Sequence, residues 1–251
     1  MQLATDDGVD LHVEELGAGP PVIMLHGLLV GNMTTWYWTA APEIARHHRV
    51  ILFDLRGHGM SGRAPTGYDV DRMTRDLESV VVKLVDEPAF LVGHSFGALV
   101  ALTFALRRPE LVRKLALVEA PLPPSSLVEL NEFLKASPDR MLDSLPQLLR
   151  ERMKAGGRQA TRFANAIRFL AMESTLLDDL RSAEDVPDDE LGLLRCPLLA
   201  VYGRASSCRA AGRRLARVVP GARLVQLPGG HFLPLEAPRA LTRVLTRFID
   251  G

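Results

Sequence analysis

Net charge, cysteine and long apolar runs are scarce in this chain of 251 residues. The 30 basic and 30 acidic residues cancel, so no basic surface field indicates a nucleic acid or an anionic membrane as a partner. No apolar run is long enough to span a membrane. The two cysteines, Cys196 and Cys208, have neither redox nor metal-ligand spacing. These absences argue against membrane, nucleic-acid-binding and disulfide-rich classes of protein.

The beginning of the chain carries no secretion signal pattern. Its first ten residues are polar and lack the apolar segment of a signal peptide. Together with the few, unpaired cysteines, this predicts a cytoplasmic protein with reduced thiols. No sequence pattern specifies an oligomeric state.

The remaining composition is that of an ordinary globular protein, with 47% hydrophobic and 24% charged residues. Short apolar runs rich in Val, Ile and Leu alternate with longer segments of helical period. The predicted strands are Val9–Glu14, Pro21–Leu25, Val50–Asp54, Ala89–Val92, Leu115–Glu119, Leu198–Tyr202 and Arg223–Leu227. The predicted helices between them are Asp69–Asp86, Phe96–Arg108, Arg209–Val219 and Pro238–Ile249. The sequence therefore predicts an α/β fold, with a mostly parallel, doubly wound sheet covered by helices.

Residues 122–194 interrupt this alternation. They contain no convincing strand and are too long for a crossover loop. Amphipathic segments are predicted at Ser125–Lys135, Arg140–Met153, Arg158–Met172 and Leu176–Ala183. We therefore expect a helical cap of residues 122–194 over the carboxyl ends of the strands, inserted into a core of residues 1–121 and 195–251.

Ser95 lies between two glycines in the stretch LVGHSFGALVAL, residues 91–102. An apolar strand is predicted before it and a helix rich in Ala and Leu after it. A G-x-S-x-G sequence in this context is typical of a nucleophile elbow, whose tight turn presents the serine at the carboxyl end of a sheet. A chance pentapeptide in a glycine-rich turn would not be expected to have both flanking elements. Ser95 is therefore the candidate nucleophile.

Three further stretches surround this serine in the sequence. They are VIMLHG (Val22–Gly27), DLRGHGMS (Asp54–Ser61) and LPGGHFLPLEAP (Leu227–Pro238). With the elbow, and in this order, they resemble the α/β-hydrolase family over nearly the whole chain. Within that family the chain is most similar to capped esterases, lactonases and thioesterases. It also resembles epoxide- and haloalkane-processing enzymes, but these use an aspartate nucleophile where this chain has Ser95.

A serine hydroxyl needs a base within hydrogen-bond reach to become a nucleophile at neutral pH. An imidazole can take and return that proton, and the resemblance implies that His231 is this base. It also implies an oxyanion hole made by the backbone N–H groups of Leu28 and Phe96. The resemblance implies no cofactor, and the spacing of the histidines predicts no metal site.

The acid of the triad departs from the usual family pattern. In most relatives an Asp follows the first strand after the cap, where this chain has VYGRASSC and offers Ser206 and Ser207 instead. Glu119 ends the strand that precedes the cap, in LALVEAP, and resembles the acid of certain haloalkane dehalogenases and polyketide-type thioesterases. Adjacent strand ends lie about 5 Å apart, so its side chain could reach the same imidazole nitrogen. The alternative is that Glu119 merely ends a strand.

Three aromatic residues are candidates for the wall of a substrate pocket. Trp36 and Trp38 follow the oxyanion loop, and Phe232 is next to the predicted base. Core packing is the equal alternative for the two tryptophans. A capped apolar pocket suits a small hydrophobic ester or acyl substrate.

Three functions remain open from the sequence. The first is a serine hydrolase that cleaves a carboxylic ester, lactone or thioester. The second is a biosynthetic acyl-processing enzyme with the same triad, acting as a thioesterase or as a cyclisation or elimination catalyst, with an acyl carrier protein as a possible partner. The third is a ligand-binding protein that has lost catalysis, because fold does not determine function.

Overall fold

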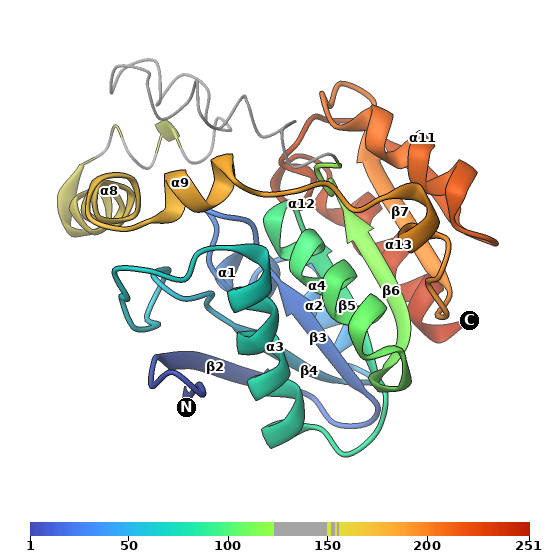
Figure 1. Cartoon of the computed structure of the whole chain (residues 1–251), viewed down its shortest axis with the longest axis horizontal. Helices are drawn as coiled ribbons and strands as arrows, with labels where there is room; N and C mark the ends of the chain where they lie inside the picture. Colours follow the sequence, from blue (N-terminus) through green and yellow to red (C-terminus); the bar gives the residue numbers. More distant parts are fainter. Residues whose placement is uncertain (123–149, 152–153, 155) are drawn as a thin grey trace.

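The computed structural model describes residues 1–122, 150–151, 154 and 156–251. Its centre is an eight-stranded sheet in the order β1-β2-β4-β3-β5-β6-β7-β8 (Figure 1). The strands are β1 Gln2–Ala4, β2 Asp10–Leu16, β3 Pro21–Leu25, β4 Arg49–Phe53, β5 Ala89–His94, β6 Val112–Val118, β7 Leu198–Gly203 and β8 Arg223–Leu227. The pairs from β4 to β8 are parallel, whereas β1 and β2 add to the edge in antiparallel pairing. The mostly parallel sheet predicted from the sequence is thus confirmed.

Helices cover both faces of this sheet, because the side chains of each buried strand alternate between two apolar clusters. In β3, Ile23 and Leu25 join the cluster beneath α3, α4 and α11, whereas Val22 and Met24 join the cluster beneath α1, α2 and α13. The helices of the first layer are α3 Val70–Leu84, α4 Phe96–Arg107 and α11 Arg209–Val218. The second layer consists of α1 Thr34–Tyr37, α2 Ala41–Ile44, α12 Leu233–Glu236 and α13 Pro238–Asp250. A short 3-10 turn, η1 Pro109–Leu111, leads into β6.

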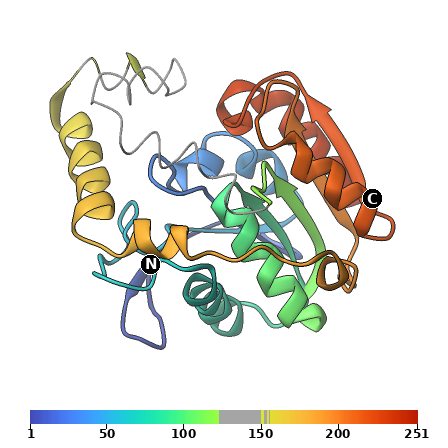
Figure 2. The same cartoon turned by 45° about the horizontal axis from the view of Figure 1, so that its top comes forward.

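The described residues between β6 and β7 form helices and no strand. These helices are α8 Gly157–Met172, α9 Leu176–Arg181 and α10 Asp188–Leu191. In Figures 1 and 2, α8 and α9 lie on the side of the molecule toward which the carboxyl ends of β3 and β6 point. Two hydrogen bonds tie α9 and its N-cap to the loop before α3: Thr175 N–H donates to Pro65 O, and Tyr68 N–H donates to the Asp179 carboxylate, both at 2.9 Å.

Two of the helices predicted for the cap occur at α8 and α9. The predicted helix Ser125–Lys135 and nearly all of Arg140–Met153 lie outside the described residues. The boundaries of the cap and core therefore stay a prediction. Among the described helices, none is both long enough and apolar enough to cross a membrane.

The sequence did not predict the short strand β1 or the single-turn helices α1, α2, α10 and α12. Each has only three or four residues, too few to establish a period of 2 or 3.6. Their positions depend on packing against the sheet, which sequence periodicity does not report.

Candidate active site

Ser95 occupies a strained turn between β5 and α4. Its backbone has φ 54° and ψ −123°, a region that residues with a side chain rarely adopt. Its N–H donates to Val118 O at 2.9 Å, which ties the turn to the neighbouring strand β6. A Cβ at Gly93 or Gly97 would come within 2.4 Å of a backbone carbonyl oxygen. The two glycines therefore allow the close strand–helix packing that presents this serine.

His231 lies in the loop between β8 and α12 and faces Ser95. Its Nε2 is 2.9 Å from Ser95 Oγ, a hydrogen-bond distance. Nε2 of His94 donates to the backbone carbonyl of His231 at 2.9 Å. The elbow and the histidine loop are thus joined by a second contact beside the Ser95 pair.

Glu119 lies at the end of β6, fully buried, with its carboxylate toward the same imidazole. Its Oε2 is 3.4 Å from His231 Nδ1, longer than the ~3 Å of a strong hydrogen bond but within ion-pair contact. The Ser206 hydroxyl and the Gly203 N–H donate to the two carboxylate oxygens. Glu119 has φ 56°, a second strained backbone position, and its N–H donates to Val201 O at 2.9 Å. The structure therefore brings the three predicted triad residues together.

Cys208 also lies at the imidazole, and the sequence reasoning missed it. Its Sγ is 3.8 Å from His231 Nδ1, and its backbone N–H donates to Ser206 Oγ at 3.0 Å. The thiol is buried. The only available sequence signal was its place in VYGRASSC, the stretch in which most relatives have their acid.

The loop that carries Leu28 approaches the elbow from β3. A Cβ on Gly27 would lie 3.0 Å from Ser95 Cβ, so the absence of a side chain there permits this approach. Leu29 has φ 63°, and its N–H donates to Nε2 of the buried His58 at 2.9 Å. Phe96 is the first residue of α4, directly after Ser95. Phe96 thus follows the serine in the chain, and Leu28 follows the glycine that packs against it; their role in an oxyanion hole stays a prediction.

The comparisons agree with this geometry. A family model for the alpha/beta hydrolase fold matches residues 20–159, more than half of the chain. The chain belongs to the alpha/beta hydrolase family. A 2-hydroxy-6-oxo-2,4-heptadienoate hydrolase from Pseudomonas putida is 30% identical to it, over 96% of this chain and 93% of that protein. This family membership and the hydrolase relatives make the chain an alpha/beta hydrolase enzyme, so the alternative of a non-catalytic binding protein is set aside.

Solved structures of two family members have the same fold. An esterase from Exiguobacterium antarcticum has a similar structure. The match covers 100% of this chain and 99% of the esterase chain, with a TM-score of 0.81 and 23% identity. An enol-lactonase from Burkholderia xenovorans LB400 matches over 100% of both chains, with a TM-score of 0.77 and 21% identity. At sequence identities of 23% and 21%, the similarity shows a shared fold alone.

The environment of His231 in this alpha/beta hydrolase favours the imidazolium. Burial opposes the charged form, but contacts to Cys208 and to the Glu119 carboxylate outweigh it and raise the pKa to about 9. A cation at this ring is therefore stabilised by the protein. That is the form which His231 would take after accepting a proton.

Three other histidines of the hydrolase are buried in the neutral form. Burial lowers the pKa of His26 to about 4, and the pKa values of His58 and His94 to about 3. His26 Nε2 accepts the Leu55 N–H at 2.9 Å while its Nδ1 donates to Gly27 O at 2.8 Å. These bonds need a neutral ring with one free nitrogen, so the histidines support the loops around Ser95 without exchanging protons at neutral pH.

Acid is expected to destabilise the hydrolase steeply through these buried histidines. Unfolded histidines titrate near 6.5, above the folded pKa values, so the unfolded chain binds more protons between about pH 6.5 and 4. Each extra proton changes the free energy of unfolding by about 1.4 kcal/mol per pH unit, so the three histidines together contribute about 4 kcal/mol per unit near pH 5. Denaturant unfolding at pH 7, 6 and 5 measures this slope. A free energy of unfolding that stays constant down to pH 5 contradicts the expectation.

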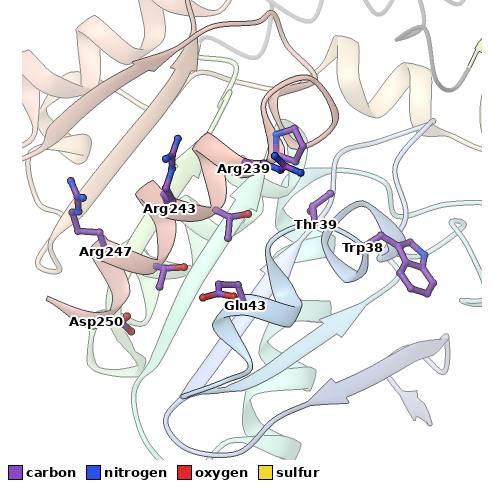
Figure 3. A pocket seen from close by; sticks show the side chains of 10 residues that line it. Trp38, Thr39, Glu43, Arg239, Arg243, Arg247 and Asp250 are labelled. Carbon is purple, nitrogen blue, oxygen red and sulfur yellow. The ribbon is translucent and has the colours of Figure 1, made fainter.

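The predicted pocket residues have different surroundings, and their role in a substrate pocket stays a prediction. Trp36 is fully buried, and its Nε1 donates to Leu25 O at 2.9 Å, so its indole belongs to the core. Trp38 is 76% exposed and lies at one end of an outer groove beside α13 (Figure 3). Successive residues of the short helix α1 and its end point in different directions, which separates the two indoles. Phe232 packs edge-on against His231 at 5.6 Å between ring centroids and stays a candidate pocket residue.

Proposed function

We propose that this alpha/beta hydrolase cleaves a carboxylic ester, lactone or thioester through an acyl-enzyme on Ser95. The observation that carries this proposal is the 2.9 Å contact between Ser95 Oγ and His231 Nε2 at a strained strand–helix turn. The Glu119 carboxylate on the other side of the ring supports it. The contacts run from nucleophile to base to orienting anion, which is the arrangement of acyl-transfer triads.

The acylation step begins when Ser95 Oγ attacks the carbonyl carbon of the substrate and His231 Nε2 takes its proton. The carbonyl oxygen becomes an oxyanion, which the backbone N–H groups of Leu28 and Phe96 stabilise in our assignment. Collapse of the tetrahedral intermediate breaks the bond to the leaving alcohol or thiol, which receives the proton from His231. Water then attacks the acyl-enzyme with His231 again as base, releasing the acid and free Ser95.

Glu119 acts in this proposal through His231. Its negative charge keeps the ring proton on Nδ1, which leaves Nε2 free to accept, and it stabilises the imidazolium that forms. Ser206 and the Gly203 N–H hold the carboxylate in place. The high pKa of His231 is the electrostatic consequence of this environment.

The substrate that we propose is a small hydrophobic acyl compound. Phe232 beside the base offers an apolar contact for its acyl or alcohol group. A second candidate is an oxo-dienoate, because the Pseudomonas putida relative with 30% identity is named for hydrolysis of such a compound. A thioester carried by an acyl carrier protein is the variant of the first proposal in which the enzyme serves a biosynthetic pathway.

A fluorophosphonate probe tests the mechanism without knowledge of the substrate. We expect mass spectrometry of the labelled protein to find one adduct, on the peptide that contains Ser95. A panel of an oxygen ester, a thioester and a lactone with matched acyl groups, together with an oxo-dienoate, then ranks the substrates by kcat/KM. Folded protein that stays unlabelled at Ser95 would overturn the acyl-enzyme proposal, and a preference for the oxo-dienoate alone would favour the second candidate.

A further inference from the structure

Three side chains with metal-ligand chemistry converge on the far side of the His231 ring from Ser95. They are the thiol of Cys208, Nδ1 of His231 and the carboxylate of Glu119, whose ligand atoms all lie within 4.8 Å of one another. They come from the end of β6 and from the loops after β7 and β8. No pair of them is close in the sequence, so their spacing along the chain gives no sign of this cluster.

The two distances from His231 Nδ1 to its neighbours suit one tetrahedral ion. Zinc binds sulfur at about 2.3 Å and nitrogen or oxygen at about 2.0–2.1 Å, so tetrahedral angles separate N from S by about 3.6 Å and N from O by about 3.3 Å. The observed separations are 3.8 Å for Cys208 Sγ to His231 Nδ1 and 3.4 Å for Glu119 Oε2 to His231 Nδ1. Movements of a few tenths of an ångström would adjust these two distances, and the sulfur and the carboxylate oxygen lie within 4.8 Å of each other.

We propose that a zinc ion, or another divalent ion that prefers sulfur and nitrogen ligands, binds Cys208, His231 and Glu119 and reversibly inhibits the enzyme. A thiolate and a carboxylate together balance the two charges of the ion. Three protein ligands leave the fourth position to water. The site is regulatory in character, because it uses the side of the imidazole that catalysis needs.

The inhibition follows from the tautomer of His231 and rests on the proposed function. In the proposed mechanism the neutral ring carries its proton on Nδ1 and accepts the Ser95 proton at Nε2. A metal ion on Nδ1 moves the one remaining proton to Nε2. That nitrogen then cannot accept from Ser95, so acylation stops until the ion leaves.

Surrounding groups already orient the proposed ligands. The Ser206 hydroxyl donates to the Glu119 carboxylate and accepts the backbone N–H of Cys208, so it links two of the ligands. The side chain of His231 is 26% exposed, whereas that of Glu119 is fully buried, so the ion would enter past the imidazole. Outer-shell hydrogen bonds of this kind hold ligands in coordinating positions.

Cys196 provides a matched control within the same chain. It is the other cysteine and is also buried. Burial raises the pKa of its thiol to about 11, which disfavours a thiolate. It takes no part in the cluster of Cys208, His231 and Glu119.

The binding experiment titrates the full chain with Zn²⁺ by calorimetry and with Co²⁺ by absorption spectroscopy. We expect one ion per chain and a sulfur-to-cobalt charge-transfer band for the unaltered protein and for Cys196→Ala. Cys208→Ala should lose the band and bind Zn²⁺ roughly 100-fold more weakly, since it lacks one of three protein ligands. Equal affinity and an equal band in Cys208→Ala, or no binding by the unaltered protein, would overturn the proposal.

The activity experiment repeats the comparison with the best substrate of the panel. Zn²⁺ should stop turnover by the unaltered enzyme and by Cys196→Ala, and a chelator should restore it. Cys208→Ala, measured against its own metal-free turnover, should stay active at zinc concentrations that stop the other two. Equal inhibition of all three proteins contradicts the assigned site. Binding is measured independently of turnover, so a failure of the hydrolase proposal would leave the metal site testable.

Discussion

Ser95→Ala is expected to lower turnover by about 10⁶-fold, because it removes the atom that forms the acyl-enzyme. The fold should remain, since alanine keeps the Cβ of Ser95 and the backbone bond from its N–H to Val118 O at 2.9 Å. The measurement is kcat with the best substrate of the panel, together with thermal unfolding of both proteins. The variant should also fail to react with the fluorophosphonate.

Ser79→Ala is the control for loss of a serine hydroxyl elsewhere. Ser79 lies on α3, where its hydroxyl donates to the helix carbonyl of Arg75 at 3.0 Å. The turnover of Ser79→Ala should stay within about twofold of that of the unaltered enzyme, as for most surface substitutions. A Ser95→Ala protein that is folded and retains most of its activity would mean that hydrolysis proceeds without this nucleophile.

Glu119→Gln is expected to lower kcat by roughly 10² to 10⁴, because it keeps the shape of the side chain but removes its charge. Without the anion the imidazolium of His231 is less stable, so its pKa falls from about 9. His231 must be neutral to act as a base, so activity rises as the pH increases through the pKa of His231. The acid limb of the kcat/KM profile should therefore move to lower pH in the variant, while the maximum falls.

The control for this change is Glu236→Gln. Glu236 is the last residue of α12, which follows the loop that carries His231. Glu236 accepts the Gly230 N–H, a bond that the glutamine oxygen can still accept. In the part of the chain that the structure describes, no hydrogen bond or ion pair joins Glu236 to the imidazole of His231. Its turnover and pH profile should stay close to those of the unaltered enzyme. Adding Ser206→Asp to Glu119→Gln is expected to restore part of the activity, because it returns a carboxylate to the usual family position. Full activity in Glu119→Gln would leave Ser95 and His231 as a dyad without an acid.

The amino-acid sequence by itself determined the sheet, the order of its main elements and the place of the candidate nucleophile. Buried parallel strands require continuous apolar runs, and covering helices require a period of 3.6, so both leave strong local patterns. The elbow is also local, because the turn at Ser95 needs glycine at positions 93 and 97 to avoid contacts of 2.4 Å. The two edge elements β1 and β2 illustrate the limit: β2 was predicted, but the three-residue β1 was too short to leave a pattern.

Only the tertiary structure decided which groups surround the imidazole of His231. Glu119 was a prediction from position, but its hydrogen bonds to Ser206 and Gly203 depend on the pairing of β6 with β7. Cys208 escaped detection for the same reason, since parallel strands bring together loop residues that are far apart in the sequence.

The same holds for the side chains around the elbow. Trp36 and Trp38 are two positions apart, yet one is enclosed in the core and the other is exposed. His26 and His58 are 5.4 Å apart between ring centroids, although 31 residues separate them in the chain. Sequence patterns indicate the local backbone conformation and which face of a helix or strand is buried. Contacts between strand ends and loops arise only when the whole sheet is assembled.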